Sequence, residues 1–408
     1  MSTLLFIFGR THELSFHELQ ALTSNPLTSI TPDVVRVEDP EDQIDPKEYI
    51  KRLGGTVKIA REKGTIDSLD PVGIAQYLGD ADRGPVTFGL SFYGADMGDV
   101  DPQLLKGIKE HLASKGMSVR YVAPHDGNTL ASVVIAKQHI HELVIIAESG
   151  GYIVGETLAV QDFETWNERD YGRPFADPKA GMLPPKVARM AVNLATHVIP
   201  ATEPGSSDNK EWIPGQARND KYPVLLDPFC GMGTVVGEAI LAGWSAIGSD
   251  QSQEVMSRAQ KNIEWLLQGS TLPLPKFLVG DATHISDVIA QSSVDAIVTE
   301  PFMGAALGKN DQFPMTNDQV KNIMKGLEKL YIGCLRDWHA VLKPAGKIVI
   351  ALPQYAISGR TYFVKNVIDR CETLGYTVSA GPLSYSRPQA VVRRQFYVLQ
   401  KGTISNKQ

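Results

Sequence analysis

The segment that most constrains the fold is residues 224–234, which read VLLDPFCGMGT. A short apolar run, typical of a buried strand, ends at Asp227, and apolar residues resume at helical spacing from Val235. The proline and glycines between them indicate a sharp turn. Because glycine has no side chain, a ligand can approach the main chain of such a turn closely. The segment therefore predicts a strand, a ligand-facing turn and a helix.

The overall composition is that of a globular protein. The chain has 408 residues, of which 43% are hydrophobic and 21% charged, and this length allows two or three domains. The apolar start TLLFIF lacks a basic leader, so we interpret residues 3–8 as a first strand and not as a signal peptide. No window approaches the length of a membrane span, and we expect no membrane association.

Cysteine and histidine usage argues against a disulfide framework and against a metal site. Cys230, Cys334 and Cys371 are widely separated, and the nine histidines show no metal-ligand spacing. We therefore expect no metal and a reducing, cytoplasmic environment. Cys230 lies in the glycine turn without a neighbouring base, which indicates a small packing residue and not a nucleophile.

The charge balance bears on nucleic-acid binding. A net charge of −6 argues weakly against nonspecific coating of nucleic acid. Residues 169–189 and 387–402 are nevertheless rich in Lys and Arg. Taken singly, each of these segments is most simply interpreted as solvated surface.

The first half of the chain predicts short mixed elements, which are typical of small α+β modules. We assign residues 1–80 to an amino-terminal α+β module and 81–165 to a second one. Residues 166–222 are assigned to a connecting helix and a flexible linker, because 200–223 are rich in Pro, Gly, Ser and Asn. Strands are expected at 3–8, 34–37, 57–60, 86–92, 118–122, 132–136 and 143–147, and helices at 15–23, 46–52, 71–78 and 101–115.

Predicted strands and helices alternate over residues 223–402. This pattern predicts a doubly wound α/β domain with a mostly parallel, seven-stranded sheet, whose ligands lie at the carboxyl ends of the strands. Asp227, Asp250, Asp281 and Glu300 fall at such ends. Taken singly, Asp227 is better explained as a helix cap and Asp281 as the start of a loop, but acids at successive strand ends favour a binding site. Strands are expected at 224–227, 245–249, 276–279, 294–299, 347–352, 376–380 and 392–399.

The glycine turn fits neither of two common phosphate-binding patterns. A dinucleotide-binding turn reads GxGxxG, but Gly231 and Gly233 are followed by Val236 where the third glycine belongs. The Gly-Lys-Ser/Thr of a P-loop is also absent from the sequence. Asp250, at the end of the second strand of this half, is placed to accept hydrogen bonds from a ribose diol. A nucleoside ligand is therefore favoured over a pyrophosphate.

The segments DPFCGMGT, GSD, GDA and TEPFMG, in this order and spacing, resemble motifs of S-adenosylmethionine-dependent methyltransferases that act on exocyclic amino groups of nucleobases. LLFIFGRTHELSFHELQAL and ERDYGRPFADPKAGMLPPKVARMAVNLA are similar to segments of the THUMP-containing tRNA guanosine N2-methyltransferases. The resemblance spans nearly the whole chain apart from residues 200–223. It implies a Rossmann-like methyltransferase domain preceded by a ferredoxin-like and THUMP-like RNA-binding region.

The resemblance further implies S-adenosylmethionine as cofactor, tRNA as partner and guanine N2 at position ten as the methylated atom. An exocyclic amine is a poor nucleophile, so its protons need hydrogen-bond acceptors while it is oriented. Glu300, Pro301 and Phe302 are the expected catalytic residues, with Phe302 stacking on the target base. The expected cofactor-binding residues are Asp227, Pro228, Phe229, Cys230, Gly231, Gly233, Thr234, Asp250, Asp281 and Ala282.

The segment TEPF departs from the family pattern of Asp or Asn, Pro, Pro and an aromatic residue. The acid Glu300 is longer by one methylene, and the aromatic Phe302 arrives one position early. Two alternatives therefore stay open from the sequence: an amino methyltransferase acting on DNA or on adenine or cytosine, and a catalytically decayed RNA-binding protein. The pattern favours neither a monomer nor an accessory subunit.

Overall fold

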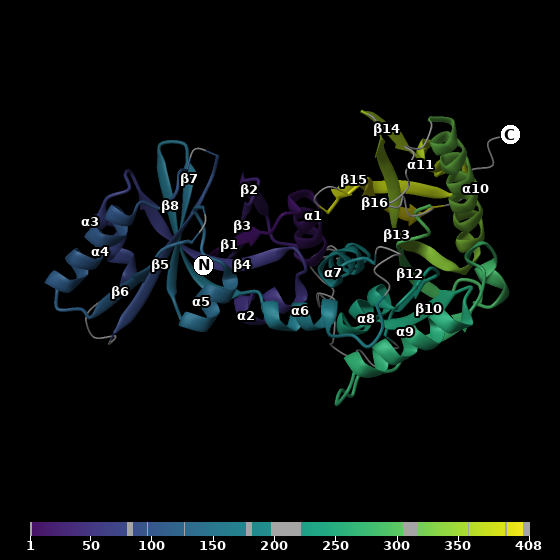
Figure 1. Ribbon diagram of the computed structural model, residues 1–408, viewed down its shortest axis with the longest axis horizontal. Coiled ribbons are helices and arrows are strands. Elements are labelled where there is room, and N and C mark those ends of the chain that lie inside the picture. Colours follow the sequence, from purple (N-terminus) through teal and green to yellow (C-terminus); the bar gives the residue numbers. More distant parts are fainter. Residues whose placement is uncertain are drawn as a thin grey trace, which may run out of the picture. The chain divides into compact units, whose positions relative to one another are not determined.

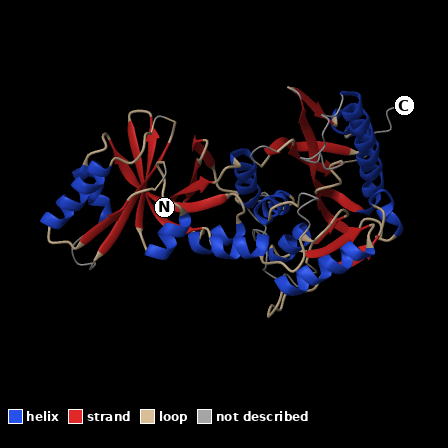
Figure 2. Cartoon of the chain, viewed as in Figure 1, coloured by secondary structure: helices blue, strands red, loops and turns tan. Residues whose placement is uncertain are grey.

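The computed structural model describes residues 2–79, 85–95, 97–125, 127–176, 182–196, 222–304, 317–357, 359–387 and 390–402. The chain forms two compact units, Met1–Trp166 and Asn167–Gln408, here called unit 1 and unit 2. Each unit combines helices with a sheet (Figures 1 and 2). The linker predicted at residues 200–223 lies almost wholly outside the described residues.

Unit 1 contains one eight-stranded sheet in the order β2-β3-β1-β4-β8-β7-β5-β6. Its first part runs β1-α1-β2-β3-α2-β4, and antiparallel pairing of β4 with β8 joins the second part to it. The modules predicted at 1–80 and 81–165 thus share a sheet, while their boundary and their ferredoxin-like and THUMP-like character stay predictions. The elements are β1 (Ser2–Phe8), α1 (His12–Leu22), β2 (Leu27–Thr31), β3 (Val34–Asp39), α2 (Pro46–Arg52), β4 (Thr56–Ile66), α3 (Pro71–Ala75), β5 (Val86–Tyr93), α4 (Pro102–Ser114), β6 (Val119–Val122), α5 (Ser132–Gln138), β7 (His141–Glu148) and β8 (Gly151–Val160).

The apolar start of the chain is buried on both faces of this sheet. Phe6 packs into one hydrophobic cluster and Leu5 and Ile7 into another, because successive side chains of a strand point to opposite faces. A continuous apolar run is typical of a strand covered on both sides. The predicted strand at residues 3–8 is confirmed by β1.

Three elements of unit 1 differ from the sequence prediction. Residues 132–136, predicted as a strand from their β-branched run, lie in helix α5, where Ile135 is buried against Leu130 and Ile140. Burial of one helical face there outweighs β propensity. The sequence pattern does not predict strands β2 and β8. In the structure β2 pairs antiparallel with β3, and β8 pairs antiparallel with β4 and β7.

A buried ion pair crosses the sheet of unit 1. The Lys58 Nζ on β4 donates to Glu142 Oε1 on β7 at 2.6 Å, and the Thr157 hydroxyl on β8 donates to Glu142 Oε2 at 2.6 Å. Lys58 is 2% exposed and Glu142 0% exposed. Burial lowers the pKa of Lys58, and the charge of Glu142 opposes this shift. The pair links strands from both predicted modules, with Ser91 of β5 also donating to Glu142.

Unit 2 contains a second eight-stranded sheet, in the order β11-β10-β9-β12-β13-β16-β15, with β14 paired to β13. Pairing is parallel from β11 to β13 and antiparallel among β13, β14, β15 and β16. The predicted α/β fold is confirmed, with β14 as an additional strand. The elements are α6 (Phe163–Tyr171), which spans the unit boundary, α7 (Pro185–Leu194), β9 (Val224–Asp227), α8 (Thr234–Leu241), β10 (Ser245–Asp250), α9 (Gln253–Leu266), β11 (Lys276–Val279), the 3-10 segment Ala282–Asp287, β12 (Val294–Thr299), α10 (Asn317–Val341), β13 (Leu342–Ile357), β14 (Arg360–Phe363), α11 (Lys365–Asp369), β15 (Tyr376–Tyr385) and β16 (Val392–Lys401).

Helix α7 is part of unit 2 and is buried along almost its whole length, with Lys186 as the less buried member. Its Arg189 Nη2 lies 2.9 Å from Glu238 Oε2 of α8, and Arg169 Nη1 of α6 lies 3.2 Å from the same oxygen. Glu238 is only 2% exposed. Because a buried carboxylate needs charged partners, these arginines hold the connecting helices on α8.

Breaking the buried pair of unit 1 tests its structural role. We expect Glu142→Leu to lower the free energy of unfolding by about 3–5 kcal/mol, because it leaves the Lys58 ammonium buried without its counter-charge. The double variant Lys58→Met/Glu142→Leu should recover much of this loss. Glu110→Ala, which breaks an exposed pair with Lys106 on α4, should cost under about 1 kcal/mol. Urea unfolding measures the free energy of unfolding of all three variants. Equal losses for Glu142→Leu and Glu110→Ala would contradict the structural role of the buried pair.

Candidate active site

Acidic residues of unit 2 meet at the carboxyl edge of its sheet. Asp227 ends β9 and Asp250 ends β10, while Asp281 and Glu300 follow β11 and β12. Since β9, β10, β11 and β12 are parallel, their carboxyl ends lie on one edge. The strand order reverses between β9 and β12, and crevices at such reversals bind ligands in open α/β sheets.

The glycine turn between β9 and α8 leaves its main chain accessible. Gly231 and Gly233 have φ of 50° and 86°, a left-handed conformation that suits glycine. A Cβ built on Gly231 would meet only the Phe229 carbonyl oxygen, at 4.0 Å, so open space adjoins this glycine. The turn thus has the space that a ligand contacting the backbone would need.

Asp227 is the most buried acid of the site, at 2% exposure. Its Oδ1 accepts hydrogen bonds from the Thr299 hydroxyl at 2.6 Å and from the Phe229 amide at 3.2 Å. Burial raises its pKa from 3.8 to about 7, Thr299 and Phe229 oppose this rise, and the charges of Asp250 and Glu300 add to it. Asp227 therefore connects the ends of β9 and β12 and does not cap α8, which begins after Gly233 without a side-chain cap.

The other two aspartates differ from it in exposure and bonding. The Asp250 Oδ1 accepts from the Ser252 amide at 3.0 Å, and the side chain is half-buried. Asp281 is exposed, and it accepts from the amide and the hydroxyl of Thr283, each at 2.8 Å. These bonds lower the Asp281 pKa. Asp281 thus caps the 3-10 segment, whose first residue Ala282 is buried and accepts from the Trp338 indole at 2.9 Å.

The remaining residues of the turn serve mainly in packing. Pro228 and Cys230 are buried, and the Cys230 Sγ lies 3.9 Å from the Met256 Sδ. Burial raises the Cys230 pKa, which disfavours the reactive thiolate. The Phe229 ring packs edge-on against Trp338 with centroids 6.4 Å apart. The site thus has no activated thiol at Cys230.

Glu300 and Arg394 form an ion pair on the other side of the strand reversal. The Arg394 Nε of β16 donates to Glu300 Oε1, and the two side chains are 10% and 15% exposed. Burial raises the pKa of Glu300, while the charges of Arg394 and Arg387 lower it. The adjoining Pro301 is buried, and Phe302 is 57% exposed, so an aromatic face is available beside the carboxylate.

Two buried tyrosines hold the main chain after Phe302. The Tyr331 hydroxyl of α10 donates to the Phe302 carbonyl at 2.6 Å, and the Tyr355 hydroxyl of β13 donates to the Met303 carbonyl. Gly304 is needed here because a Cβ would come within 2.3 Å of the Tyr355 hydroxyl oxygen. The exposed Phe302 ring therefore stands on a fixed backbone.

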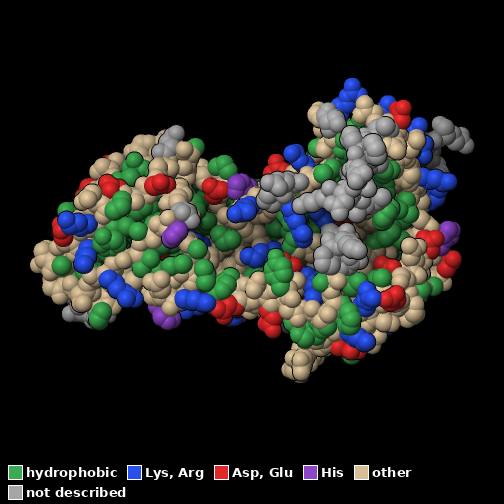
Figure 3. Space-filling view, in the orientation of Figure 1, with side chains coloured by type: hydrophobic (Ala, Val, Ile, Leu, Met, Phe, Trp, Pro, Cys, Tyr) green, Lys and Arg blue, Asp and Glu red, His purple; other side chains and the backbone are tan. Residues whose placement is uncertain are grey.

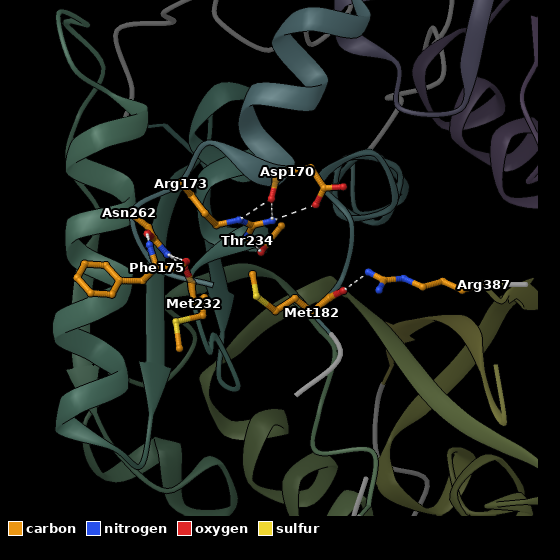
Figure 4. Close-up of polar contacts among 8 residues, drawn as sticks. All are labelled: Asp170, Arg173, Phe175, Met182, Met232, Thr234, Asn262 and Arg387. Carbon is orange, nitrogen blue, oxygen red and sulfur yellow. Dashed lines mark hydrogen bonds and ion pairs between the residues drawn. The ribbon is translucent and has the colours of Figure 1, made fainter. Parts of the chain in front are cut away.

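The segment that precedes α7 is anchored to the glycine turn (Figure 4). The Arg173 Nη1 donates to the Thr234 hydroxyl at 2.9 Å and its Nη2 to Asp170 Oδ1 at 3.1 Å. The Asn262 amide bridges the Phe175 and Met232 carbonyls at 2.9 and 3.0 Å. Arg387 anchors the same segment at a second point, donating to the Met182 carbonyl at 2.9 Å.

Several of these contacts were not predicted from the sequence. Arg394 and Arg173 lie in the two cation-rich segments that the sequence pattern predicts to be solvated surface, yet both side chains are largely buried. Tyr331 and Tyr355 gave no signal at all, because a tyrosine inside an apolar pattern is indistinguishable from ordinary core. Thr299 adjoins Glu300, and its polarity at the end of an apolar strand was the available clue.

Comparison with solved structures supports the fold of the whole chain. The structure of TrmN from Thermus thermophilus matches it with a TM-score of 0.56 and 17% sequence identity, covering 98% of this chain and 100% of that one. At this identity the likeness shows the fold alone. The α/β arrangement described above, with two units in sequence, is therefore that of a known structure.

Sequence comparison finds relatives among tRNA-modifying enzymes. No protein-family model matches the chain. The tRNA (guanine(10)-N2)-dimethyltransferase of Pyrococcus abyssi is 28% identical over 228 residues, which are 56% of this chain and 52% of that protein. The enzyme of the same name from Methanothermobacter thermautotrophicus is 29% identical over 210 residues, 50% of this chain and 48% of that protein. The match thus spans about half the length of these relatives.

In the part of the chain that the structure describes, no helix has the length and apolar character needed to span a membrane. Among the same residues, no three His, Cys, Asp or Glu side chains gather in a way that could hold a metal ion.

The raised pKa of Asp227 predicts a pH-dependent stability. The folded protein keeps a proton on Asp227 that the unfolded chain releases above pH 4, so this group's contribution to the free energy of unfolding falls as the pH rises to about 7. Between pH 5 and 7, the wild type should lose about 2 kcal/mol more than Asp227→Asn, which keeps an acceptor oxygen but does not titrate. Urea unfolding of the ligand-free protein at the two pH values measures this difference.

Asp281→Asn is the matched control for that experiment. Because the Asp281 pKa is lowered from 3.8, its contribution to stability is complete above pH 4 and is lost only at lower pH. Its pH profile between 5 and 7 should therefore parallel the wild type. If the profile of Asp227→Asn did so as well, the raised pKa of Asp227 would be wrong.

Proposed function

We propose that the protein transfers methyl groups from S-adenosylmethionine to an exocyclic amino group of a tRNA base, namely guanine N2 at position ten. The proposal rests above all on one juxtaposition: an open glycine turn and the pair Glu300 and Phe302 lie at neighbouring strand ends, joined by the Asp227–Thr299 hydrogen bond. The names of the relatives supply the base and its position in tRNA.

The residues at the carboxyl edge suit S-adenosylmethionine. The accessible backbone at Gly231 would receive its methionine end, and Asp250 would accept hydrogen bonds from its ribose hydroxyls. Asp281, being exposed, would face its adenine. The buried residues Pro228, Cys230 and Ala282 and the partly buried Phe229 would shape the site. When bound, the cofactor supplies a methyl group on a positively charged sulfur. A cation bound there would favour the ionised form of Asp227, whose charge would add to that of the neighbouring Asp250.

The Glu300 side has the properties needed to prepare an amine for methylation. A base amine is a weak nucleophile because its lone pair is shared with the ring, so catalysis depends on orientation and on acceptors for its protons. The Glu300 carboxylate provides such an acceptor. Phe302 offers an exposed ring on which the base can stack, an arrangement worth about 1–3 kcal/mol per base. Pro301 and the tyrosine-held backbone keep the two in a fixed relation.

We assign recognition of folded RNA chiefly to unit 1, as the THUMP-like resemblance implies. Structured RNA is recognised largely through its shape and its backbone. Acidic and basic side chains are interspersed over the face shown in Figure 3, so the net charge of −6 does not make that face uniformly acidic. Basic side chains on that face could therefore contact an anionic ligand.

Nucleoside mass spectrometry tests the proposed function. The purified protein, S-adenosylmethionine and an unmodified tRNA transcript with guanosine at position ten should yield guanosine carrying one or two methyl groups on N2. A transcript with adenosine at position ten should yield none. Methylated adenosine or cytidine would instead indicate the other amino methyltransferase class, and the absence of any methylated nucleoside would favour a decayed enzyme.

Paired variants separate the cofactor side from the amine side. Asp250→Ala should weaken binding of S-adenosylhomocysteine by about 1.5–3 kcal/mol, the range for a charged hydrogen bond, whereas Glu300→Ala should leave it nearly unchanged. Glu300→Ala should lower the methylation rate roughly 100-fold or more, and Glu300→Gln should retain more activity because it keeps an acceptor oxygen. Calorimetry and single-turnover kinetics measure these effects. If Glu300→Ala methylated tRNA at the wild-type rate, the target amine would not bind at the end of β12.

A further inference from the structure

The two carboxylate oxygens of Glu300 have different surroundings. Oε1 accepts the hydrogen bond from Arg394 Nε. Within the described ranges, Oε2 has no hydrogen-bond partner. It is also not one of the fully buried side-chain atoms without a partner, so it is accessible. One oxygen is therefore occupied by the protein, and the other is available to a ligand.

Arg394 is itself fixed by its position in the sheet. It lies on β16, which is paired on one side with β13 at Pro353 and on the other with β15 at Tyr385. The residue is 8% exposed, and its guanidinium lies 5.9 Å from the centre of the Tyr385 ring. Its neighbour Arg393 is exposed, as expected for the opposite face of a strand.

The length of the glutamate explains why such an anchor is needed. The sequence motif that TEPF resembles has Asp or Asn at this position, and Glu300 adds one rotatable bond. An extra bond gives the carboxylate more conformations, and each immobilised side chain costs free energy. A charge-assisted hydrogen bond to a buried arginine can fix one conformation.

The charges around Glu300 bear on its ionisation. Burial raises the pKa of Glu300 from its ordinary value, and the charges of Arg394 on β16 and Arg387 between β15 and β16 oppose this rise. Asp227 of β9 and Tyr331 of α10 also interact electrostatically with it. The two arginines thus favour the ionised carboxylate, the form in which both oxygens act only as acceptors.

We propose that Arg394 is a positioning residue for the reaction: by holding Oε1 of Glu300, it aims Oε2 at the target amine. This inference rests on the proposed function. In this arrangement Arg394 affects the reaction through Glu300 and does not touch the substrate. It also accounts for the departure of TEPF from the expected motif, because the longer acid is paired with an arginine from a distant strand.

Three variants of the full chain test this role. Arg394→Ala should lower kcat for tRNA methylation by on the order of 10- to 100-fold, the size of effect expected when a reacting group is misplaced. Arg394→Lys keeps the positive charge and should retain more activity. Arg393→Ala, the matched control, should behave as the wild type. Binding of S-adenosylhomocysteine and KM for tRNA should change little in any of them, which distinguishes misplacement from a folding defect.

The pH profile provides a readout that a merely structural role would not move. Loss of the Arg394 charge raises the pKa of Glu300 further, so the acidic limb of the kcat profile should shift to higher pH in Arg394→Ala. It should not shift in Arg393→Ala. Asp227 is present in both variants and does not affect the comparison.

Each outcome bears on a different claim. If the wild type methylates tRNA and Arg394→Ala has the rate and pH profile of Arg393→Ala, the positioning role is wrong and the proposed function stands. A lower rate with an unshifted pH profile and weakened S-adenosylhomocysteine binding would also overturn the positioning role, because it would indicate a general structural defect. If the wild type transfers no methyl group to tRNA, the proposed function and the role of Arg394 both fail.

Discussion

The hydrogen bond between Thr299 and Asp227 is the interaction on which the geometry of the site depends. It joins the carboxyl ends of β9 and β12 at the point where the strand order reverses. The acceptor, the carboxyl group of Asp227, is buried. A buried acid is costly unless it is hydrogen-bonded or protonated, and here both conditions contribute. The glycine turn on one side and Glu300 on the other are thus held at a defined separation by one short contact.

Much of unit 2 could be predicted because its pattern is local and repetitive. Alternation of apolar strands with helices placed Asp227, Asp250, Asp281 and Glu300 on one sheet edge, and the structure has them there. Side-chain partners from distant segments could not be predicted. Arg394 reaches Glu300 only because β16 inserts antiparallel between β13 and β15, a register that no local pattern specifies. In unit 1, helix α5 was predicted as a strand because its β-branched residues suit either structure.

Two buried acids of unit 2, Glu238 and Asp227, differ in the charges of their partners. Glu238 is matched by two arginines in the packing of α6, α7 and α8, where no ligand is required. Among the described residues, by contrast, Asp227 accepts hydrogen bonds from neutral donors and lies near two other acids. One carboxylate is electrostatically satisfied and the other is not. A cation at the carboxyl edge would therefore stabilise the ionised form of Asp227, whereas Glu238 already has two arginines beside it.

The anchoring of α6 and α7 on α8 limits where the chain could be joined to a different module. A fusion that joined a different module directly before β9 would discard Arg169 and Arg189 and leave Glu238 buried without these two partners. A junction that keeps these contacts would therefore have to precede the start of unit 2 at Asn167, well upstream of β9.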